Sequence, residues 1–327
     1  AAQHPRLTLE ADRFNLECNS TPQALAGHPF SALGSELDEV LQVVRRAARA
    51  QGGRVAMIGI LPTLREADLQ SQALTESPRY RALSAGLRRL RCGAFAVGID
   101  GPEGPLVVAC NDVTFEGANT SWQVHLKVPL ANFVDCYNAA QIAIAPVLGL
   151  AGNSPIFLGR RLWDETRIAL FRQAVDDRRA AGGEEDWRPA RVSFGHGWVR
   201  RGPYELFAES VAMHAPVVPV LSDEEPLEAL ERGVPGLAEL RLHHGMVWRW
   251  NRAVYDSAGT GHVRIEMRPL PAGPTVDDML ANAAFAVGLT LALAPDADRL
   301  TSRLTFGQAR RNFYAAARYG MDAELLW

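Results

Sequence analysis

The sequence lacks the features of several common protein classes. Its 34 Lys and Arg residues against 37 Asp and Glu residues give a formal charge of −3. Proteins that bind nucleic acid or anionic membranes through bulk charge carry a clear excess of positive charge, so we expect neither partner here. The four cysteines form no C-x-x-C pair, which argues against a zinc ribbon or a disulfide framework and favours a reducing cytoplasm.

The sequence also lacks a convincing membrane segment and the better-known catalytic motifs. The longest uncharged stretch, from Cys136 to Gly159, is interrupted by Pro146, Pro155 and several polar residues, so we interpret it as a buried helix followed by a turn. The first twenty residues are charged throughout and contain no apolar core of a signal peptide. There is no Walker motif, dinucleotide-binding glycine fingerprint, nucleophile elbow or HExxH helix.

What is present is an ordinary globular composition with mixed elements. Hydrophobic residues make up 47% and charged residues 22% of the 327 positions, enough apolar material to bury a core. This length suggests two domains but also allows one large one, and we treat residues 1–327 as a single catalytic domain. The predicted helices cover 35–51, 80–90, 133–150, 164–179 and a segment opened by Pro274 and Thr275. The predicted strands cover 54–61, 93–100, 105–113, 121–128, 245–255 and 262–270.

The prediction of the first helix and the prediction of the fold class each depend on residues that lie close together in the sequence. Ser35 and Asp38 have the spacing of a capping box at the start of the first helix, which the Gly52-Gly53 pair would end. The strands follow no regular βαβ rhythm, and tight turns join neighbouring ones. The class is therefore α+β with a curved, largely antiparallel sheet and flanking helices.

The most informative segment is HVRIEMRPLPAGPT, which begins at His262. On a strand, Arg264, Glu266 and Arg268 share one face, because side chains alternate. One carboxylate between two guanidinium groups suits a site for a metal ion and phosphate oxygens. The alternative is a solvated strand face with a ladder of salt bridges, and the spacing alone favours it.

Two weaker candidates are a polar pair and an acidic pair. Gln123 and His125 project together from a strand, where they could ligate a metal, orient a substrate or serve only structure. Glu10 and Glu17 are seven residues apart, so a regular strand would place them on opposite faces and a bend is needed to bring both to one site. By themselves they are surface carboxylates.

Taken together, the segments resemble the second type of glutamate–cysteine ligase, a carboxylate–amine ligase of the glutamine-synthetase-like superfamily. The similar segments occur in one order along the chain: RFNLE, IGILPTL, SPRY, ANTSWQVHLKV, GNSPIFLG, DETRIALF, VWRWNR and HVRIEMRPLPAGPT followed by DDMLANAAF. The resemblance implies a glutamine-synthetase-like catalytic fold, ATP bound through Mg²⁺ ions, and an acyl phosphate that an amine attacks.

The resemblance also implies roles for single residues. It makes Glu10, Glu17 and Glu266 metal ligands and places His125 beside a metal-bound phosphate. It makes Arg268 the γ-phosphate contact and Arg264 a second catalytic arginine. Two further residues fall on the substrate side, namely Arg167 of DETR as a clamp for the amino-acid carboxylate and Gln123 as a neighbouring contact.

One departure keeps alternatives open. Family members normally begin with a strand that carries a G-x-E-x-E-like motif, and this sequence starts after that point. The sequence is then either a fragment of a longer ligase or a reduced homologue that binds a nucleotide or amino acid without turnover. The substrates would be small molecules, an amino acid and an amine such as cysteine, and the protein could be a homo-oligomer.

Overall fold

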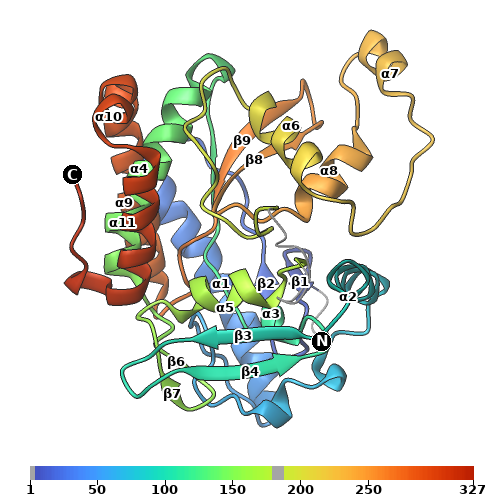
Figure 1. Cartoon of the computed structure of the whole chain (residues 1–327), viewed down its shortest axis with the longest axis vertical. Coiled ribbons are helices and arrows are strands. Elements are labelled where there is room, and N and C mark those ends of the chain that lie inside the picture. The colour runs from blue at the N-terminus through green and yellow to red at the C-terminus, as the bar shows by residue number, and fades with distance from the viewer. Residues whose placement is uncertain (1–3, 179–187) are drawn as a thin grey trace.

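The computed structural model describes residues 4–178 and 188–327. Helices form most of one side of the molecule, and short strands lie beside them (Figure 1). The helices are α1 Pro29–Ala50, α2 Pro78–Arg91, α3 Thr114–Gly117, α4 Phe133–Ala151, α5 Thr166–Ala174, α6 Tyr204–Met213, α7 Pro226–Arg232, α8 Ala238–Gly245, α9 Val276–Leu293, α10 Ala297–Arg303 and α11 Phe306–Tyr319. The strands are β1 Leu7–Leu9, β2 Leu16–Cys18, β3 Phe95–Ile99, β4 Leu106–Cys110, β5 Val124–Lys127, β6 Ile156–Phe157, β7 Arg160–Arg161, β8 Asn251–Asp256 and β9 His262–Met267.

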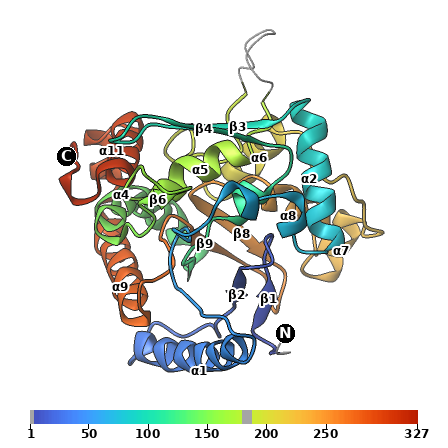
Figure 2. The ribbon, with the colours of Figure 1, turned by 90° about the horizontal axis from the view of Figure 1, so that it is seen from below.

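The strands form small antiparallel sheets. β5, β9 and β8 make a three-stranded sheet in that order, and β1–β2, β3–β4 and β6–β7 are separate pairs. The α+β class with largely antiparallel pairing and flanking helices is therefore confirmed. Figure 2 shows the β1–β2 hairpin in the space between α1 and the strands β8 and β9.

The core lies between the three-stranded sheet and the C-terminal helices. Ile265 and Met267 of β9 are buried, as alternation predicts, and they belong to the same apolar cluster as α4 and α11. Trp248 and Trp250 are buried in this cluster as well. Most of α4 is buried too, which confirms the interpretation of the uncharged stretch as a core helix.

Within residues 4–178 and 188–327, two helices are long and apolar enough to cross a membrane by length and composition. They span Leu130–Ala151, whose apolar window is 72% buried, and Val276–Arg303, whose window is only 33% buried. Burial explains the composition of the first helix, because a core helix is apolar on every side. It does not explain the second.

Several local predictions were wrong. The strand expected over 245–255 begins only at Asn251, because α8 extends to Gly245. The first helix begins at Pro29, six residues before the proposed cap, and Ser35 donates to the Ser31 carbonyl within the helix at 3.2 Å. Proline at the first helical position supplies a start that the Ser35–Asp38 pattern concealed. Residues 54–61 form no strand; only Ile60 makes an isolated bridge, with Asn119. Only Gly59 and Ile60 of this run are buried, and without a partner strand the segment remains an irregular connection.

Helix α9 begins where Pro274 and Thr275 predicted it, and α10 and α11 follow it. Thr275 Oγ1 accepts from the Asp278 amide at 3.1 Å, and the Asp278 carboxylate accepts from the Thr275 amide at 3.2 Å. This reciprocal capping box satisfies two amides that the first turn of a helix leaves without partners. The four cysteines are free, in agreement with the absence of a disulfide pattern.

Candidate active site

The polar face of the three-stranded sheet collects most of the predicted residues. In the register, His125 on β5 lies opposite Glu266 on β9, which in turn lies opposite Arg252 on β8. The same register places Arg264 opposite Lys127. Alternation along β9 therefore puts Arg264 and Glu266 on one face, as predicted. Arg252, the last residue of the VWRWNR segment, joins them from β8, although no role was predicted for it.

Glu266 is buried at the centre of this face, only 3% exposed. Its carboxylate accepts from Arg252 Nε at 2.7 Å and Nη2 at 3.2 Å, and from Arg268 Nη1 at 3.2 Å. Burial alone would raise the pKa of Glu266, but the guanidinium groups of Arg252 and Arg268 outweigh burial and hold that pKa well below its usual range. Glu266 is thus ionised and fully engaged by protein donors.

His125 is held as a neutral imidazole. Burial lowers its pKa, while Glu266 opposes that effect and Arg264 reinforces it. Arg264 Nε donates to His125 Nδ1 at 2.9 Å, so Nδ1 carries no proton and the remaining proton lies on Nε2. His125 Nε2 lies 3.5 Å from the Glu266 carboxylate. Both ring nitrogens face protein groups, which leaves neither lone pair directed to a metal ion in this conformation.

Two further predicted residues have modest contacts. Arg264 Nη1 donates to Asp256 Oδ2 at 2.9 Å, so the guanidinium bridges a carboxylate and His125. Gln123 precedes β5 and donates to Ser121 Oγ at 3.4 Å. These ion pairs along the strands correspond to the salt-bridge ladder of the alternative interpretation. That interpretation also required a solvated strand face, and Glu266 is buried rather than solvated. A charge is kept in a buried position only when it is paired.

A hairpin turn brings the acidic pair together. Glu10 follows β1 and Glu17 lies in β2, where it is opposite Thr8 and accepts from Thr8 Oγ1 at 3.0 Å. The bend that the odd spacing required is the turn between these strands. Burial raises the pKa of Glu10 to about 8, and the charges of Glu116 and Glu17 add to the rise.

Two carboxylates of this cluster were missed. Glu116 lies in α3, and burial raises its pKa to about 7 although Arg268 and Arg79 draw it down. Asp12 lies in the hairpin turn, is 0% exposed, and has no hydrogen-bond partner for either carboxylate oxygen. Burial, with Glu116 and Asp112 nearby, raises its pKa to about 8. Glu116 lies two residues before the ANTSWQVHLKV segment, which begins at Ala118, and this proximity was the available signal. Asp12 had none, because only the fold brings it there.

Arg268 connects the acidic cluster with the sheet face. Its guanidinium donates to Glu266, and its charge lowers the pKa of Glu116 against burial. Its Nε is buried and has no hydrogen-bond partner. A buried donor without an acceptor is costly, and so are the partnerless oxygens of Asp12. The site therefore holds unsatisfied groups of both signs.

Arg167 is buried against the end of β9. Its side chain is 3% exposed; Nε donates to Glu165 Oε1 at 2.9 Å, and the guanidinium also donates to the carbonyl groups of Arg268 and Pro269. Its guanidinium also lies over the Trp250 ring at 5.9 Å. These contacts tie α5 to the end of β9 and position Arg268. They give no support to its role as a clamp for a substrate carboxylate.

The acidic cluster fits a divalent cation by its chemistry. Mg²⁺ prefers hard carboxylate oxygens. Burial raises the pKa values of Glu10, Asp12 and Glu116, and a bound cation would offset the cost of keeping these buried carboxylates charged. Across residues 4–178 and 188–327, no three His, Cys, Asp or Glu side chains are already arranged as a metal site. Glu266 and His125 fit a cation less well, because protein groups already engage them.

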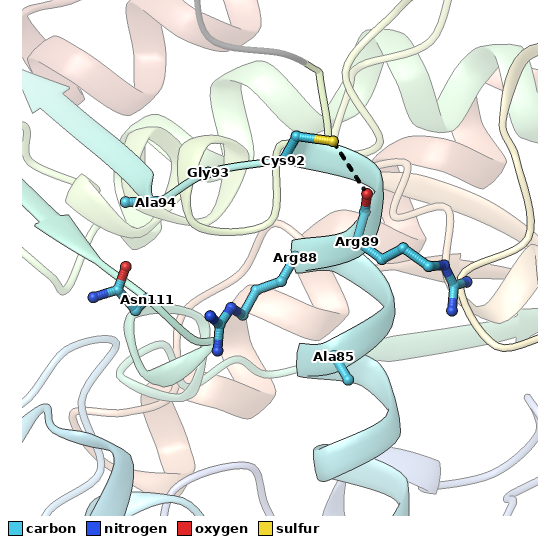
Figure 3. A pocket seen from close by; sticks show the side chains of 7 residues that line it. All are labelled: Ala85, Arg88, Arg89, Cys92, Gly93, Ala94 and Asn111. Carbon is cyan, nitrogen blue, oxygen red and sulfur yellow. Dashed lines mark hydrogen bonds between the residues drawn. The ribbon is translucent and has the colours of Figure 1, made fainter.

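A surface depression lies outside this site, at the C-terminal end of α2 (Figure 3). It has a volume of about 520 Å³, and Arg88, Arg89 and Cys92 line it together with Gly93 and Asn111. The Cys92 thiol donates to the Arg89 carbonyl at 3.4 Å. These side chains are exposed, and none of the predicted residues lies among them.

The comparison with known families agrees with the order of segments along the chain. The family model described as glutamate–cysteine ligase family 2 matches residues 5–327. The chain belongs to this family. Membership supports a carboxylate–amine ligase kind of function. No match to the chain is found among curated proteins.

Proposed function

We propose that this member of glutamate–cysteine ligase family 2 is an ATP- and Mg²⁺-dependent ligase. It joins the side-chain carboxylate of glutamate, or of a similar amino acid, to an amine such as that of cysteine. The carboxylate first accepts the γ-phosphoryl group of ATP, which releases ADP. The amine then attacks the acyl phosphate, forming an amide bond and releasing phosphate.

One observation carries the proposal: partnerless groups of both signs lie in one buried site. Arg268 Nε lacks an acceptor, and both Asp12 carboxylate oxygens lack a donor. Glu116, whose pKa responds to Arg268, lies among these groups. A phosphate that carries divalent cations would satisfy both sets, because phosphate accepts from guanidinium groups and carboxylates ligate the cation. Glu10, Glu17 and Glu116 would hold Mg²⁺, which neutralises phosphate charge when it is bound.

The chain's own residues perform the remaining tasks. Glu266 holds Arg252 and Arg268 in fixed positions through its paired oxygens, so their charge is in place before the substrates arrive. Arg167 fixes the backbone of Arg268 from behind. His125, neutral and oriented by Arg264, can donate from Nε2. Phosphoryl transfer needs this kind of positioning and charge neutralisation more than a protein nucleophile.

The test is phosphate release by the full-length native protein from ATP and Mg²⁺, with glutamate and a panel of amines, and with the product identified by mass spectrometry. We expect release that requires both glutamate and one amine, together with a γ-glutamyl amide. Binding of ATP without turnover for any acid and amine would instead support a non-catalytic homologue. Release that does not depend on the amine would contradict the ligase reaction.

Substitutions in the site, each compared with the same substitution at an exposed position, test the roles of single residues. Arg268→Lys keeps the charge but removes the Nε donor and the planar fork, so we expect at least a tenfold loss of turnover. Arg65→Lys, at an exposed surface pair, is the control and should leave turnover unchanged. Glu116→Gln should weaken the response to Mg²⁺, whereas Glu103→Gln in an exposed turn should not. Full activity of Arg268→Lys would contradict the role assigned to Arg268.

A further inference from the structure

A second pocket lies outside the active site, beside the C-terminal part of α11. Its volume is about 570 Å³, which is within the range of small-molecule sites, on the order of 300–1,000 Å³. The residues that line it come from α11, from the chain that follows α11, and from Trp163, which precedes α5. Figure 2 shows α11 at the edge of the molecule beside the C-terminal end of the chain. The described residues that line this pocket include none of those assigned to the active site.

Arg318 is held in this pocket by aromatic rings. Its guanidinium group lies over the Trp163 ring at 5.9 Å and over the Tyr319 ring at 5.4 Å. Its ion-pair partner, Asp100, is 4.0 Å away and its side chain is 72% exposed, so this pair is weak. A guanidinium group that is stacked on rings and weakly paired presents its N–H donors to an added carboxylate in a fixed orientation.

The pocket carries charges of both signs. Arg311 and Arg318 line it on α11, and Asp322 and Glu324 line it from the chain that follows. All four side chains belong to exposed residues. Because the two signs are present in equal number among the lining residues, the pocket matches a ligand that carries one carboxylate and one ammonium group.

The charges next to the lining residues do not favour an anion. Arg172 lies over the ring of Tyr314, another lining residue, at 5.5 Å. Two carboxylates balance it, since Asp100 lies beside Arg318 and Asp164 lies close to Gly320 in the turn after α11. A phosphate ester carries nearly two negative charges at pH 7 and would be repelled by these carboxylates as well as by those that line the pocket.

The pocket also borders the contacts that hold Arg268. The Glu165 amide donates to the Ala317 carbonyl of α11 at 2.8 Å. The Glu165 carboxylate accepts from Arg167, which in turn donates to the Arg268 carbonyl. A ligand that contacts Trp163 and α11 together binds best when these contacts are formed. It therefore favours the arrangement in which Arg268 is held in place.

We propose that this pocket binds an α-amino acid with an aromatic side chain and that the bound amino acid raises the turnover of the active site. The carboxylate of the ligand pairs with Arg318, and its ammonium group pairs with Asp322 or Glu324. Its ring packs against Tyr314 and Tyr319, the latter 50% exposed in the empty pocket. The effect on turnover rests on the proposed ligase function, whereas the binding does not.

The test of binding is calorimetric titration of the full-length protein with L-tryptophan, without ATP or Mg²⁺. We expect saturable binding of one tryptophan per chain. Indole-3-propionate, which lacks the ammonium group, and L-alanine, which lacks the ring, should bind more weakly. Arg318→Gln and Tyr319→Ala should each raise the dissociation constant at least tenfold. Arg310→Gln, at an exposed arginine of the same helix that does not line the pocket, is the control and should bind like the native protein.

Two measurements separate this pocket from the active site. Arg268→Lys should leave tryptophan binding unchanged, because Arg268 does not line the pocket. In a native protein that shows ligase turnover, saturating tryptophan should raise the turnover number. Arg318→Gln should remove this rise without changing the turnover measured in the absence of tryptophan.

The outcomes distinguish the two claims. The binding proposal is overturned if no saturable binding occurs, if Arg318→Gln and Tyr319→Ala bind tryptophan as tightly as the native protein, or if AMP binds more tightly and responds to the same substitutions. Binding that leaves the turnover of an active ligase unchanged would overturn the effector role. Tryptophan binding by a native protein without ligase turnover would support the pocket and contradict the proposed function.

Discussion

The pairing of Glu266 with two arginines makes a quantitative prediction about stability. Glu266→Gln keeps the size of the side chain and one oxygen acceptor but removes the negative charge between Arg252 and Arg268. Burial, together with the charges of Arg268 and Arg264, already lowers the pKa of Arg252 against the effect of Glu266, and the substitution leaves Arg252 without that counter-charge. We expect the variant to fold but to lose stability.

The size of the loss follows from the burial of the three side chains. The Glu266 side chain is 4% exposed, and those of Arg252 and Arg268 are 12% and 13% exposed. Breaking a buried ion pair by removing one partner costs about 3–5 kcal/mol. The retained amide oxygen and the slight solvent access of both arginines place the expected loss near the lower end, at about 3 kcal/mol.

The pH dependence provides an independent check. The folded-state pKa of Glu266 lies below its ordinary value of 4.5. A depressed carboxyl pKa contributes stability that is full above the unfolded pKa and is lost as the pH falls through the folded one. The difference between the native protein and Glu266→Gln should therefore be constant above pH 4.5 and should shrink below it.

The assay is urea unfolding followed by tryptophan fluorescence, in buffers without added metal, from pH 8 down to the lowest pH at which the native protein remains folded. Glu103→Gln in an exposed turn is the control, with an expected change below about 0.5 kcal/mol. A difference near zero at pH 7, or one that grows as the solution is acidified, would refute the ion-pair arrangement described here.

Three other substitutions test neighbouring parts of the site. Asp12→Asn removes a partnerless buried carboxylate whose pKa is raised from 3.8 to about 8. The difference of about 4 between these pKa values corresponds to on the order of 5 kcal/mol, so the variant should increase the unfolding free energy of the metal-free protein by about that much at pH 8 and by little below pH 4. A decrease at pH 8 in urea unfolding would contradict this. Gly117→Ala should lower the unfolding free energy by about 1–3 kcal/mol, because the added Cβ would overlap the Asp12 carboxylate. Gly93→Ala is the control: the space around it is open, so calorimetry should show no fall in its melting temperature. Arg167→Lys should lower both the melting temperature and the turnover number, with little change in the KM for glutamate, because Arg167 donates to the backbone at Arg268 and Pro269. A large rise in that KM alone would instead support a role for Arg167 in binding the substrate carboxylate.

The sequence by itself determined the features that depend on local periodicity. Alternation along His262–Met267 was enough to separate Arg264 and Glu266 from Ile265, and the core confirms it. The Thr275–Asp278 capping box and the buried character of α4 likewise follow from residues close in the chain. The order of the segments was sufficient to indicate the family, because many moderately specific matches in one order rarely coincide.

Tertiary structure alone decided the contacts that join distant segments. Arg252 pairs with Glu266 across a strand register that no spacing fixes. Asp12 becomes a partnerless carboxylate only because the β1–β2 turn packs against α3. Arg167 donates to carbonyl groups at the end of β9, a contact between distant segments that the DETR motif does not show.

The physical reason is the range of the interactions. Helix caps and strand alternation are set by neighbours a few residues apart, so the sequence displays them directly. The charge balance of a site depends on which carboxylates and guanidinium groups are buried together, and burial is a property of the whole packed chain. The sequence therefore identified much of the charged face, and only the fold decided which of its charges are already paired and which await a ligand.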